Sequence, residues 1–216
     1  MGGPSSDSEP SAAVRAIAEV IPWYPFKKIA RFYDIAPLLA RPDLMQKVVD
    51  EFKARYGARG VTHVAGIESR GFLFTPIAMA LGVPFVMLRK PGKIPNTVSS
   101  AGYQVEYGKR DGLCIQRDAV GAGDKVLLID DLVATGGTLS AGIQCVQMLG
   151  AEVVECACVV SLKLFEDPPA DSGIPSRARL WKDLGLKAPV WGLISEDLLT
   201  LEAKLGEGYV DDGEEH

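Results

Sequence analysis

The chain has 216 residues, of which 47% are hydrophobic and 24% are charged, and its formal net charge is −5. A chain of this length and composition can bury a core of its own, so one globular domain with short additions is expected. The acidic balance argues against a nucleic-acid-binding surface, which normally carries a basic excess. The longest apolar runs have the length of β-strands, and therefore no membrane-spanning helix is predicted.

The potential metal-binding and redox-active residues are few: Cys114, Cys145, Cys156, Cys158, His63 and His216. The cysteine spacing matches no zinc motif, and two histidines are too few for a multi-histidine metal site. Reduced thiols without a disulfide pattern are typical of intracellular proteins, so we expect the chain to be cytoplasmic.

The first forty residues are predicted to form a separate N-terminal segment. Residues 1–10 are small and polar and are expected to be disordered. Apolar residues recur at helical spacing between residues 12 and 21, and the following Pro-Trp-Tyr-Pro sequence ends that helix. Residues 11–40 are therefore expected to hold a helix and an irregular segment, ahead of a core at 41–195.

Within the core, helices are expected to alternate with strands. Helices are predicted at 42–56, 71–82 and 138–150, and strands at 61–67, 84–90, 125–130, 152–162 and 189–194. Pro76 belongs in a first helical turn, so its helix either starts near Thr75 or kinks there. Continuous β-branched runs separated by helices indicate an α/β fold with a mostly parallel sheet covered on both faces.

Three segments fall outside this alternation. Residues 91–105 are rich in Pro, Gly, Ser and Asn and have no period, which is typical of a lid loop. Residues 166–188 form a polar, proline-containing insertion, and residues 196–216 form an extension that ends in an acidic, solvated tail.

The most informative stretch is VLLIDDLVATGGTLSAG, residues 126–142. Asp130 and Asp131 end an aliphatic strand, and in a parallel sheet ligands bind beyond the carboxyl ends of the strands. Residues 134–138 then lead into a helix, where backbone N–H groups and the helix dipole favour an anion such as phosphate. The alternative is an acidic strand end followed by an ordinary capped helix.

Two familiar phosphate motifs do not fit this loop. It has no lysine before Thr138, as a Walker A loop requires, and it lacks the G-x-G-x-x-G spacing of a dinucleotide site. A phosphate loop beside two carboxylates fits a sugar phosphate, because the acids can accept hydrogen bonds from ribose hydroxyls or face a magnesium ion.

Residues 126–138 resemble the phosphoribosyl-pyrophosphate (PRPP) signature of the type I phosphoribosyltransferases, which have a Rossmann-like fold. IESRGFLF (67–74), MLRKPGKIPN (87–96), YQVEYGK (103–109) and FYDIAPLL (32–39) resemble further segments of the adenine phosphoribosyltransferase family. The likeness runs in the family's order from about residue 14 to residue 195. It implies an N-terminal hood over the base and a mobile lid at 91–105.

The resemblance also implies the roles of the residues around PRPP. Asp130 and Asp131 bind the ribose, and Ala134, Thr135, Gly136, Gly137 and Thr138 bind the 5′-phosphate. Pyrophosphate is bound by Ser69, Arg70, Arg89, Lys90 and Lys93, since arginine grips phosphates in bidentate fashion. Similar enzymes carry a non-proline cis peptide in this loop, which predicts one at Glu68–Ser69 or Ser69–Arg70.

The remaining implied roles concern the base and the chemistry. Glu106 and Arg70 are the candidate catalytic residues, with Glu106 placed near the base. Phe32 stacks on adenine and the backbone of Arg31 reads its edge. Many relatives have arginine where this chain has Tyr33, so the contacts on that side of the base are open, and Arg31 is a candidate substitute.

Together these features predict an enzyme that transfers ribose 5-phosphate from PRPP to adenine, giving AMP and pyrophosphate. Magnesium is the implied cofactor, bound mainly through PRPP, with Asp130 and Asp131 as candidate protein ligands. The implied assembly is a homodimer, without nucleic-acid or membrane partners. One alternative is transfer to hypoxanthine, guanine, xanthine or orotate, and another is a non-catalytic PRPP-binding regulator.

Overall fold

The computed structural model describes residues 9–26, 29–100, 103–104 and 110–202. Glu106, the last fourteen residues of the predicted acidic tail and most of the predicted disordered N-terminus lie outside these ranges. The chain divides into two compact units, one formed by residues 1–48 with 196–216 and the other by residues 49–195. Each unit is described by itself below.

The smaller unit contains a β-hairpin that the sequence did not predict. Its elements are α1 (Ala12–Ala18), β1 (Trp23–Phe26), β2 (Ile29–Tyr33), α2 (Ala36–Leu39) and α7 (Glu196–Glu202). The Ser11 hydroxyl accepts a hydrogen bond from the N–H of Val14 and so caps α1. β1 and β2 pair antiparallel, with Tyr24 opposite Phe32. The prolines before and within β1 end helix α1, as predicted, but they do not prevent this short edge-type pairing.

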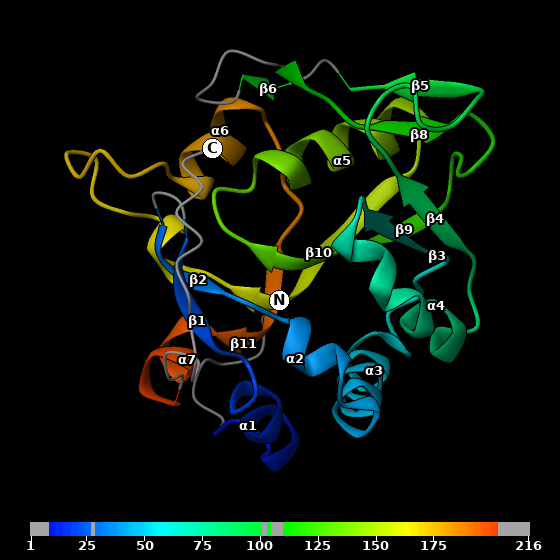
Figure 1. Cartoon of the computed structure of the whole chain (residues 1–216). Helices are drawn as coiled ribbons and strands as arrows, with labels where there is room; N and C mark the ends of the chain where they lie inside the picture. Colours follow the sequence, from blue (N-terminus) through cyan, green and yellow to red (C-terminus); the bar gives the residue numbers. More distant parts are fainter. Residues whose placement is uncertain (1–8, 27–28, 101–102, 105–109, 203–216) are drawn as a thin grey trace. The chain divides into compact units, whose positions relative to one another are not determined.

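The larger unit is built on a five-stranded parallel sheet with the strand order β11-β10-β9-β3-β4 (Figure 1). These strands are β3 (His63–Ile67), β4 (Phe85–Leu88), β9 (Lys125–Val133), β10 (Glu152–Ser161) and β11 (Val190–Ser195). Every pairing within this sheet is parallel. The predicted α/β fold with a parallel sheet is confirmed.

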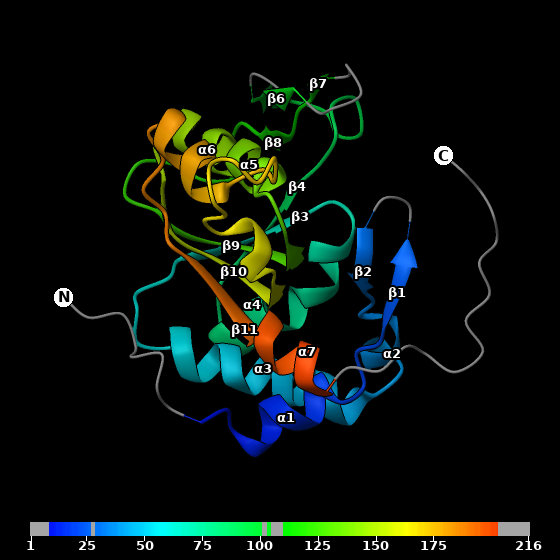
Figure 2. The same cartoon turned by 90° about the vertical axis from the view of Figure 1, so that its left-hand side faces the viewer.

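Helices cover both faces of this sheet. Helix α5 (Gly137–Met148) and helix α6 (Arg177–Asp183) lie on one face, and α4 (Thr75–Leu81) lies on the opposite face (Figures 1 and 2). Pro76 occupies the first turn of α4, which follows the 3-10 turn η1 (Arg70–Phe74), so the helix starts at Thr75 rather than kinking. The long helix α3 (Pro42–Tyr56) has the predicted bounds, and a second 3-10 turn, η2 (Lys163–Phe165), follows β10.

Part of the predicted lid is held by backbone hydrogen bonds. Strand β5 (Thr97–Ser99) lies inside the predicted lid and pairs antiparallel with β8 (Cys114–Gln116), while Arg89 forms an isolated bridge with Cys114. A further two-stranded pairing joins β6 (Tyr103–Gln104) to β7 (Arg110–Asp111). The predicted lid therefore includes a strand between residues 97 and 99, and residues 101–102 and 105 are outside the described ranges.

Strand β9 forms the centre of the sheet and of the core. Residues 126–129 are fully buried, because helices cover both faces of the sheet at this strand. The strand extends to Val133, three residues further than predicted, since β10 continues to pair with it as far as Ser161. On its other side β3 pairs only as far as Ile129. Among the described residues no helix is long and apolar enough to span a membrane.

Candidate active site

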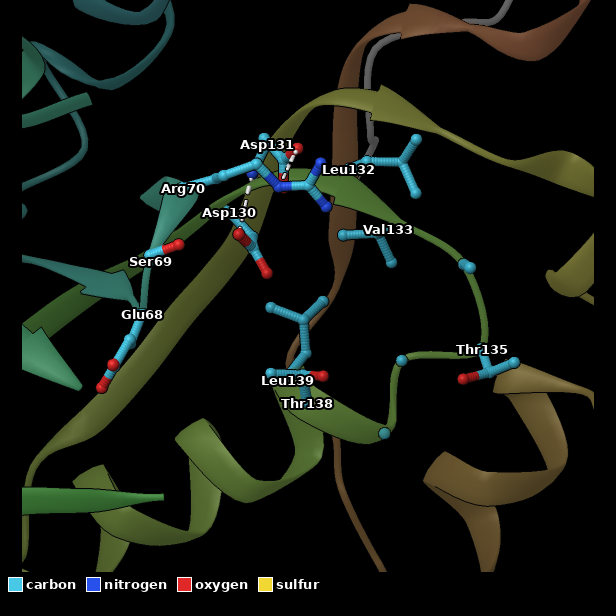
Figure 3. Close-up of a pocket in the computed structure, with 13 residues that line it drawn as sticks. Glu68, Ser69, Arg70, Asp130, Asp131, Leu132, Val133, Thr135, Thr138 and Leu139 are labelled. Atoms are coloured by element: carbon cyan, nitrogen blue, oxygen red, sulfur yellow. Dashed lines mark hydrogen bonds and ion pairs between the residues drawn. The ribbon is translucent and has the colours of Figure 1, made fainter. Parts of the chain in front are cut away.

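A pocket of about 260 Å³ opens where β9 projects beyond β3 (Figure 3). It is lined by residues 68–70 and 130–139. The volume is slightly below the roughly 300–1,000 Å³ typical of small-molecule sites, and the position matches the carboxyl-end rule for parallel sheets. The predicted acid pair, the predicted phosphate loop and two predicted pyrophosphate ligands, Ser69 and Arg70, are thus brought together in one cavity.

Two glycines allow the predicted pyrophosphate loop to approach the acid pair. A Cβ atom on Gly71 would lie 2.7 Å from the carbonyl oxygen of Ile129, and one on Gly66 would lie 2.7 Å from the carbonyl oxygen of Gly71. Backbone therefore packs directly on backbone at this point. The peptide bond Glu68–Ser69 is cis, which confirms the sequence prediction.

The two adjacent aspartates differ in burial, since Asp131 is buried and Asp130 is partly exposed. Asp131 is 2% exposed, and the Oδ1 of Asp130 accepts a hydrogen bond from the backbone N–H of Asp131 at 2.9 Å. Burial, followed by the neighbouring charge of Asp131, raises the pKa of Asp130 well above its usual value. Burial also raises the pKa of Asp131, while the positive charge of Arg70 opposes that shift. The pocket thus holds concentrated negative potential that a cation or a hydroxyl donor would relieve.

One carboxylate oxygen of this pair is incompletely satisfied. The Nε of Arg70 lies 3.0 Å from Oδ2 of Asp131, which is an ion-pair distance, and Figure 3 shows the guanidinium lying across the strand at this point. The contact lacks hydrogen-bond geometry, so among the described residues the buried Oδ2 has no hydrogen-bond donor. Buried polar atoms are normally paired, and a hydroxyl group of a bound ligand would supply the missing donor.

The predicted phosphate loop leads into the first turn of α5. Gly136 adopts a left-handed conformation with φ of 80° and forms the N-cap of the helix. The first turn contains no acidic residue that would oppose an anion. First-turn N–H groups have no acceptor within a helix, and together with the helix dipole they suit a phosphate.

Glu68 lines the pocket, but its side chain points away from the acid pair (Figure 3). It accepts hydrogen bonds from Nε of Arg89 at 3.1 Å, from Nη2 of Arg89 at 3.3 Å and from the backbone N–H of Lys90 at 2.9 Å. The hydrogen bonds from Arg89 and then from Lys90 lower the pKa of Glu68. The sequence prediction assigned Glu68 no role, although a lone acid beside predicted pyrophosphate cations was a signal for one.

Among the described residues, the others predicted to bind pyrophosphate or adenine do not line this pocket. Arg89 and Lys90 reach the pocket edge through Glu68, and Lys93 is close enough for its charge to act on the same carboxylate. Arg31 lies in the smaller unit, with its guanidinium carbon 5.2 Å from the ring centroid of Trp23. Phe32 is half-buried, and Glu106 lies outside the described residues.

A helix N-terminus that suits an anion and an acid pair meet at the carboxyl edge of a parallel sheet, which is the arrangement of an α/β protein with a ligand site at that edge. The family model described as "Phosphoribosyl transferase domain" matches residues 38–173, more than half of the chain. The chain therefore belongs to the phosphoribosyltransferase family.

Within this family, the chain is similar in sequence to adenine phosphoribosyltransferases. The chain is 51% identical over 155 residues to adenine phosphoribosyltransferase 2 of Arabidopsis thaliana, covering 71% of this chain and 80% of the relative. It is 50% identical over 152 residues to the adenine phosphoribosyltransferase of Pasteurella multocida, covering 70% and 83%.

The chain is also similar to solved structures of adenine phosphoribosyltransferases. The adenine phosphoribosyltransferase of Leishmania tarentolae has a TM-score of 0.77 at 30% identity, covering 89% of this chain and 91% of that one. The Trypanosoma brucei enzyme, solved with AMP, pyrophosphate and ribose 5-phosphate, has a TM-score of 0.73 at 30% identity, covering 98% and 88%.

Proposed function

We propose that this chain transfers ribose 5-phosphate from PRPP to adenine, which forms AMP and pyrophosphate and salvages the purine. The observation that carries this proposal is the unsatisfied Oδ2 of Asp131 in the same pocket as the α5 anion loop. A ribose 5-phosphate brings a hydroxyl donor and a phosphate in one molecule. The adenine phosphoribosyltransferase of Trypanosoma brucei, to which the chain is similar, was solved in complex with that sugar phosphate.

In this reaction the bond from the anomeric carbon of the ribose to a pyrophosphate oxygen breaks, and a bond to a ring nitrogen of adenine forms. Pyrophosphate leaves with the electron pair, and the nitrogen loses its proton. Asp130 and Asp131 hold the ribose hydroxyls, and residues 134–138 hold the 5′-phosphate. Such positioning of both reactants, with charge stabilisation at the leaving group, supplies most of the rate.

The leaving pyrophosphate carries a large negative charge that the protein must balance. Ser69, Arg70, Arg89, Lys90 and Lys93 are proposed to hold it. The pocket position of Ser69 and Arg70, and the link from Glu68 to Arg89 and Lys90, support this role. Glu106 is proposed to assist proton transfer or charge stabilisation at the base, and Arg31 and Phe32 to bind adenine.

Magnesium is the proposed cofactor. Among the described residues no group of three or more His, Cys, Asp or Glu side chains could hold a metal ion. Magnesium is often bound through one or two carboxylates together with substrate phosphates, so Asp130 and Asp131 fit as the protein ligands of an ion held mainly by PRPP oxygens. The ion would neutralise charge on the departing pyrophosphate.

We further propose that the enzyme is a cytoplasmic homodimer. All four cysteines are free and buried, which suits a reducing compartment. The family resemblance implies the dimer. It also implies that some of the lid cations, Arg89, Lys90 and Lys93, act across the dimer interface. Cell fractionation with an antibody to the chain tests the compartment.

The substrate is tested by supplying PRPP and magnesium with adenine, hypoxanthine, guanine, xanthine or orotate in separate reactions. We expect AMP to form much faster than any other nucleotide. Formation of a different nucleotide, without AMP, would show that the chain serves another base. PRPP binding without any transfer, combined with salt-sensitive DNA binding, would favour the regulator instead.

A further inference from the structure

A buried arginine lies directly behind the predicted phosphate loop. Arg177, the first residue of α6, is 5% exposed. Its Nη1 donates to the carbonyl oxygen of Ala134 at 3.2 Å, and its Nη2 donates to Oγ of Ser161 at 3.4 Å. One guanidinium therefore links the loop after β9 to the end of β10, although the predicted site did not include it.

The charge of Arg177 has no close counterion. Both acceptors are neutral oxygens, and within the described part of the chain no carboxylate lies at ion-pair distance from this side chain. Burial lowers the pKa of Arg177, and the more distant charge of Glu166 opposes that shift. An arginine remains protonated even when buried. The fold thus keeps a positive charge behind the loop that Glu166 compensates only from a distance, which is costly unless an anion binds nearby.

The loop itself lacks a cation. No lysine or arginine occurs between Asp131 and Ser140, whereas a phosphate group brings up to two negative charges. Backbone N–H groups and the helix dipole supply only partial charges. Arg177 is the full positive charge that the structure places against this loop.

Arg177 also sets the direction of a peptide group. In a trans peptide the N–H points opposite to the preceding carbonyl group. Because the Ala134 carbonyl is drawn toward Arg177, the N–H of Thr135 points away from it. The bond therefore fixes which side of the loop presents a donor.

Helix α6 packs closely against the phosphate loop at Gly136. A Cβ atom on Gly136 would lie 2.5 Å from the ring of Trp181 and 3.0 Å from Cγ of Arg177. The Trp181 ring is anchored by its Nε1, which donates to the carbonyl oxygen of Ala188 at 2.9 Å. Figure 2 shows α6 alongside α5. The insertion at 166–188, which contains α6, therefore packs behind the phosphate loop at 134–138.

We propose that Arg177 is a positioning residue for the 5′-phosphate of PRPP and AMP, because its buried charge and its bond to Ala134 prepare the loop for a phosphate dianion. This inference rests on the proposed assignment of residues 134–138 to that phosphate. It adds a residue, and a role for the insertion, that the family resemblance did not supply.

The experiment compares Arg177→Gln with Arg177→Lys. Glutamine keeps a hydrogen-bond donor and loses the charge, whereas lysine keeps the charge. Binding of AMP and of adenosine is measured by calorimetry, because the two ligands differ only in the phosphate. We expect Arg177→Gln to weaken AMP binding about tenfold or more, with adenosine binding unchanged. Arg177→Lys keeps the charge but cannot reproduce the two-nitrogen bridge, so its loss of AMP affinity should be clearly smaller than that of Arg177→Gln.

Arg179→Gln is the matched control. It lies on the same helix and also donates to carbonyl oxygens, those of Pro168 and Ile174, but not to the loop. Its AMP affinity should equal that of the parent. Equal AMP losses in Arg177→Gln and Arg177→Lys, or AMP binding by Arg177→Gln within about twofold of the parent, would overturn the proposal. If the parent itself binds no AMP, the proposed function fails and the inference fails with it.

A pH series on Arg177→Lys tests the charge even if Arg177→Gln does not fold. A lysine at this buried position loses its proton on the way to about pH 10, whereas arginine does not. The groups that act electrostatically on this position are Glu166, Cys156 and Cys158. Burial raises the pKa of both thiols, so they stay neutral. The lysine variant should lose AMP affinity relative to the parent as pH rises, and a constant ratio would contradict the proposal.

Discussion

Asp130 shows a conflict between binding and stability at a single residue. Its pKa is raised in the folded chain by burial and by the charge of Asp131. The folded state is therefore most stable, as far as this group is concerned, below the unfolded-state pKa of about 4, and loses that contribution as pH rises through the folded value. Above the folded pKa, the ionised carboxyl of Asp130 destabilises the ligand-free fold, and a bound hydroxyl or cation offsets that cost.

Asp130→Asn should accordingly stabilise the ligand-free protein while weakening PRPP binding. We expect the free energy of unfolding at pH 7 to rise by about 0.5–2 kcal/mol, and the PRPP affinity to fall at least about tenfold. Urea unfolding and calorimetry measure the two effects. The stability difference should disappear toward pH 4 or below, and a difference that grows on acidification would show that the sign is wrong.

Glu106 is predicted to act on the reaction rather than on PRPP binding. Because general acid–base assistance contributes typically ~10²–10⁴-fold, Glu106→Ala should lower kcat by a factor in that range. PRPP affinity should change little, since this side chain is assigned to the base. Single-turnover kinetics with a PRPP titration separate the two quantities, and an unchanged kcat would remove Glu106 from catalysis.

At the scale of elements, Glu68 joins the pyrophosphate loop to the end of β4. Its carboxylate receives three hydrogen bonds from Arg89 and Lys90, and it is partly exposed. Glu68→Gln should release Arg89 and raise the KM for PRPP about two- to fivefold, the range of a partly solvated ion pair. AMP affinity is the internal control, because the 5′-phosphate loop is untouched. Equal losses for PRPP and AMP would indicate a general disturbance of the pocket instead.

A second buried carboxylate joins α3 to the sheet far from the pocket. Glu155 on β10 is 5% exposed and accepts hydrogen bonds from Tyr56 at 2.6 Å and from two nitrogens of Arg55 at 2.9 Å. The guanidinium of Arg55 also lies 4.5 Å from the ring centroid of Trp191 on β11. Burial raises the pKa of Glu155, but these hydrogen bonds and the charges of Arg55 and Arg59 outweigh it, so the net shift is downward.

Glu155→Gln should therefore destabilise the fold at neutral pH by about 3 kcal/mol, the cost of leaving a buried partner charge unpaired. A lowered carboxyl pKa means that its stabilisation is present above the unfolded value of about 4.3 and is lost as pH falls through the folded value. The difference from the parent should shrink below about pH 4. Asp43→Asn, which removes an exposed ion pair to Arg41, should shift the urea midpoint much less than Glu155→Gln does.

The contacts of Glu155 illustrate why the sequence predicts helices and strands better than it predicts contacts between distant residues. The apolar runs of β9 and β10 and the glycine after α3 indicate their elements directly, and Val126 to Thr138 carries the phosphate motif within one segment. The contact from Arg55 to Glu155 joins residues 100 positions apart, which no local pattern encodes. The polar composition of residues 166–188 conceals helix α6, although Ser176 before it and Gly185 after it are ordinary cap signals.

At the scale of the whole molecule, three exposed apolar side chains lie on consecutive elements, η1, α4 and β4, the last of which is an end strand of the sheet. Leu73 on η1, Met79 on α4 and Met87 on β4 are 40%, 77% and 41% exposed. β4 is the last strand of the five-stranded sheet on this side, and exposed apolar side chains commonly mark interfaces. These elements are the candidate contact surface of the proposed homodimer.

Met79→Glu tests this surface, because a charge introduced into an apolar contact must be desolvated when the dimer forms. We expect the dimer dissociation constant, measured by sedimentation, to rise at least about tenfold, which corresponds to ~1.4 kcal/mol. Met148→Glu is the matched control, since Met148 is 55% exposed but ends α5 on the other face of the sheet. A dimer that weakens equally in both variants, or in neither, would place the interface elsewhere. If lid cations act across the interface, Met79→Glu should also raise the KM for PRPP at concentrations where it is monomeric.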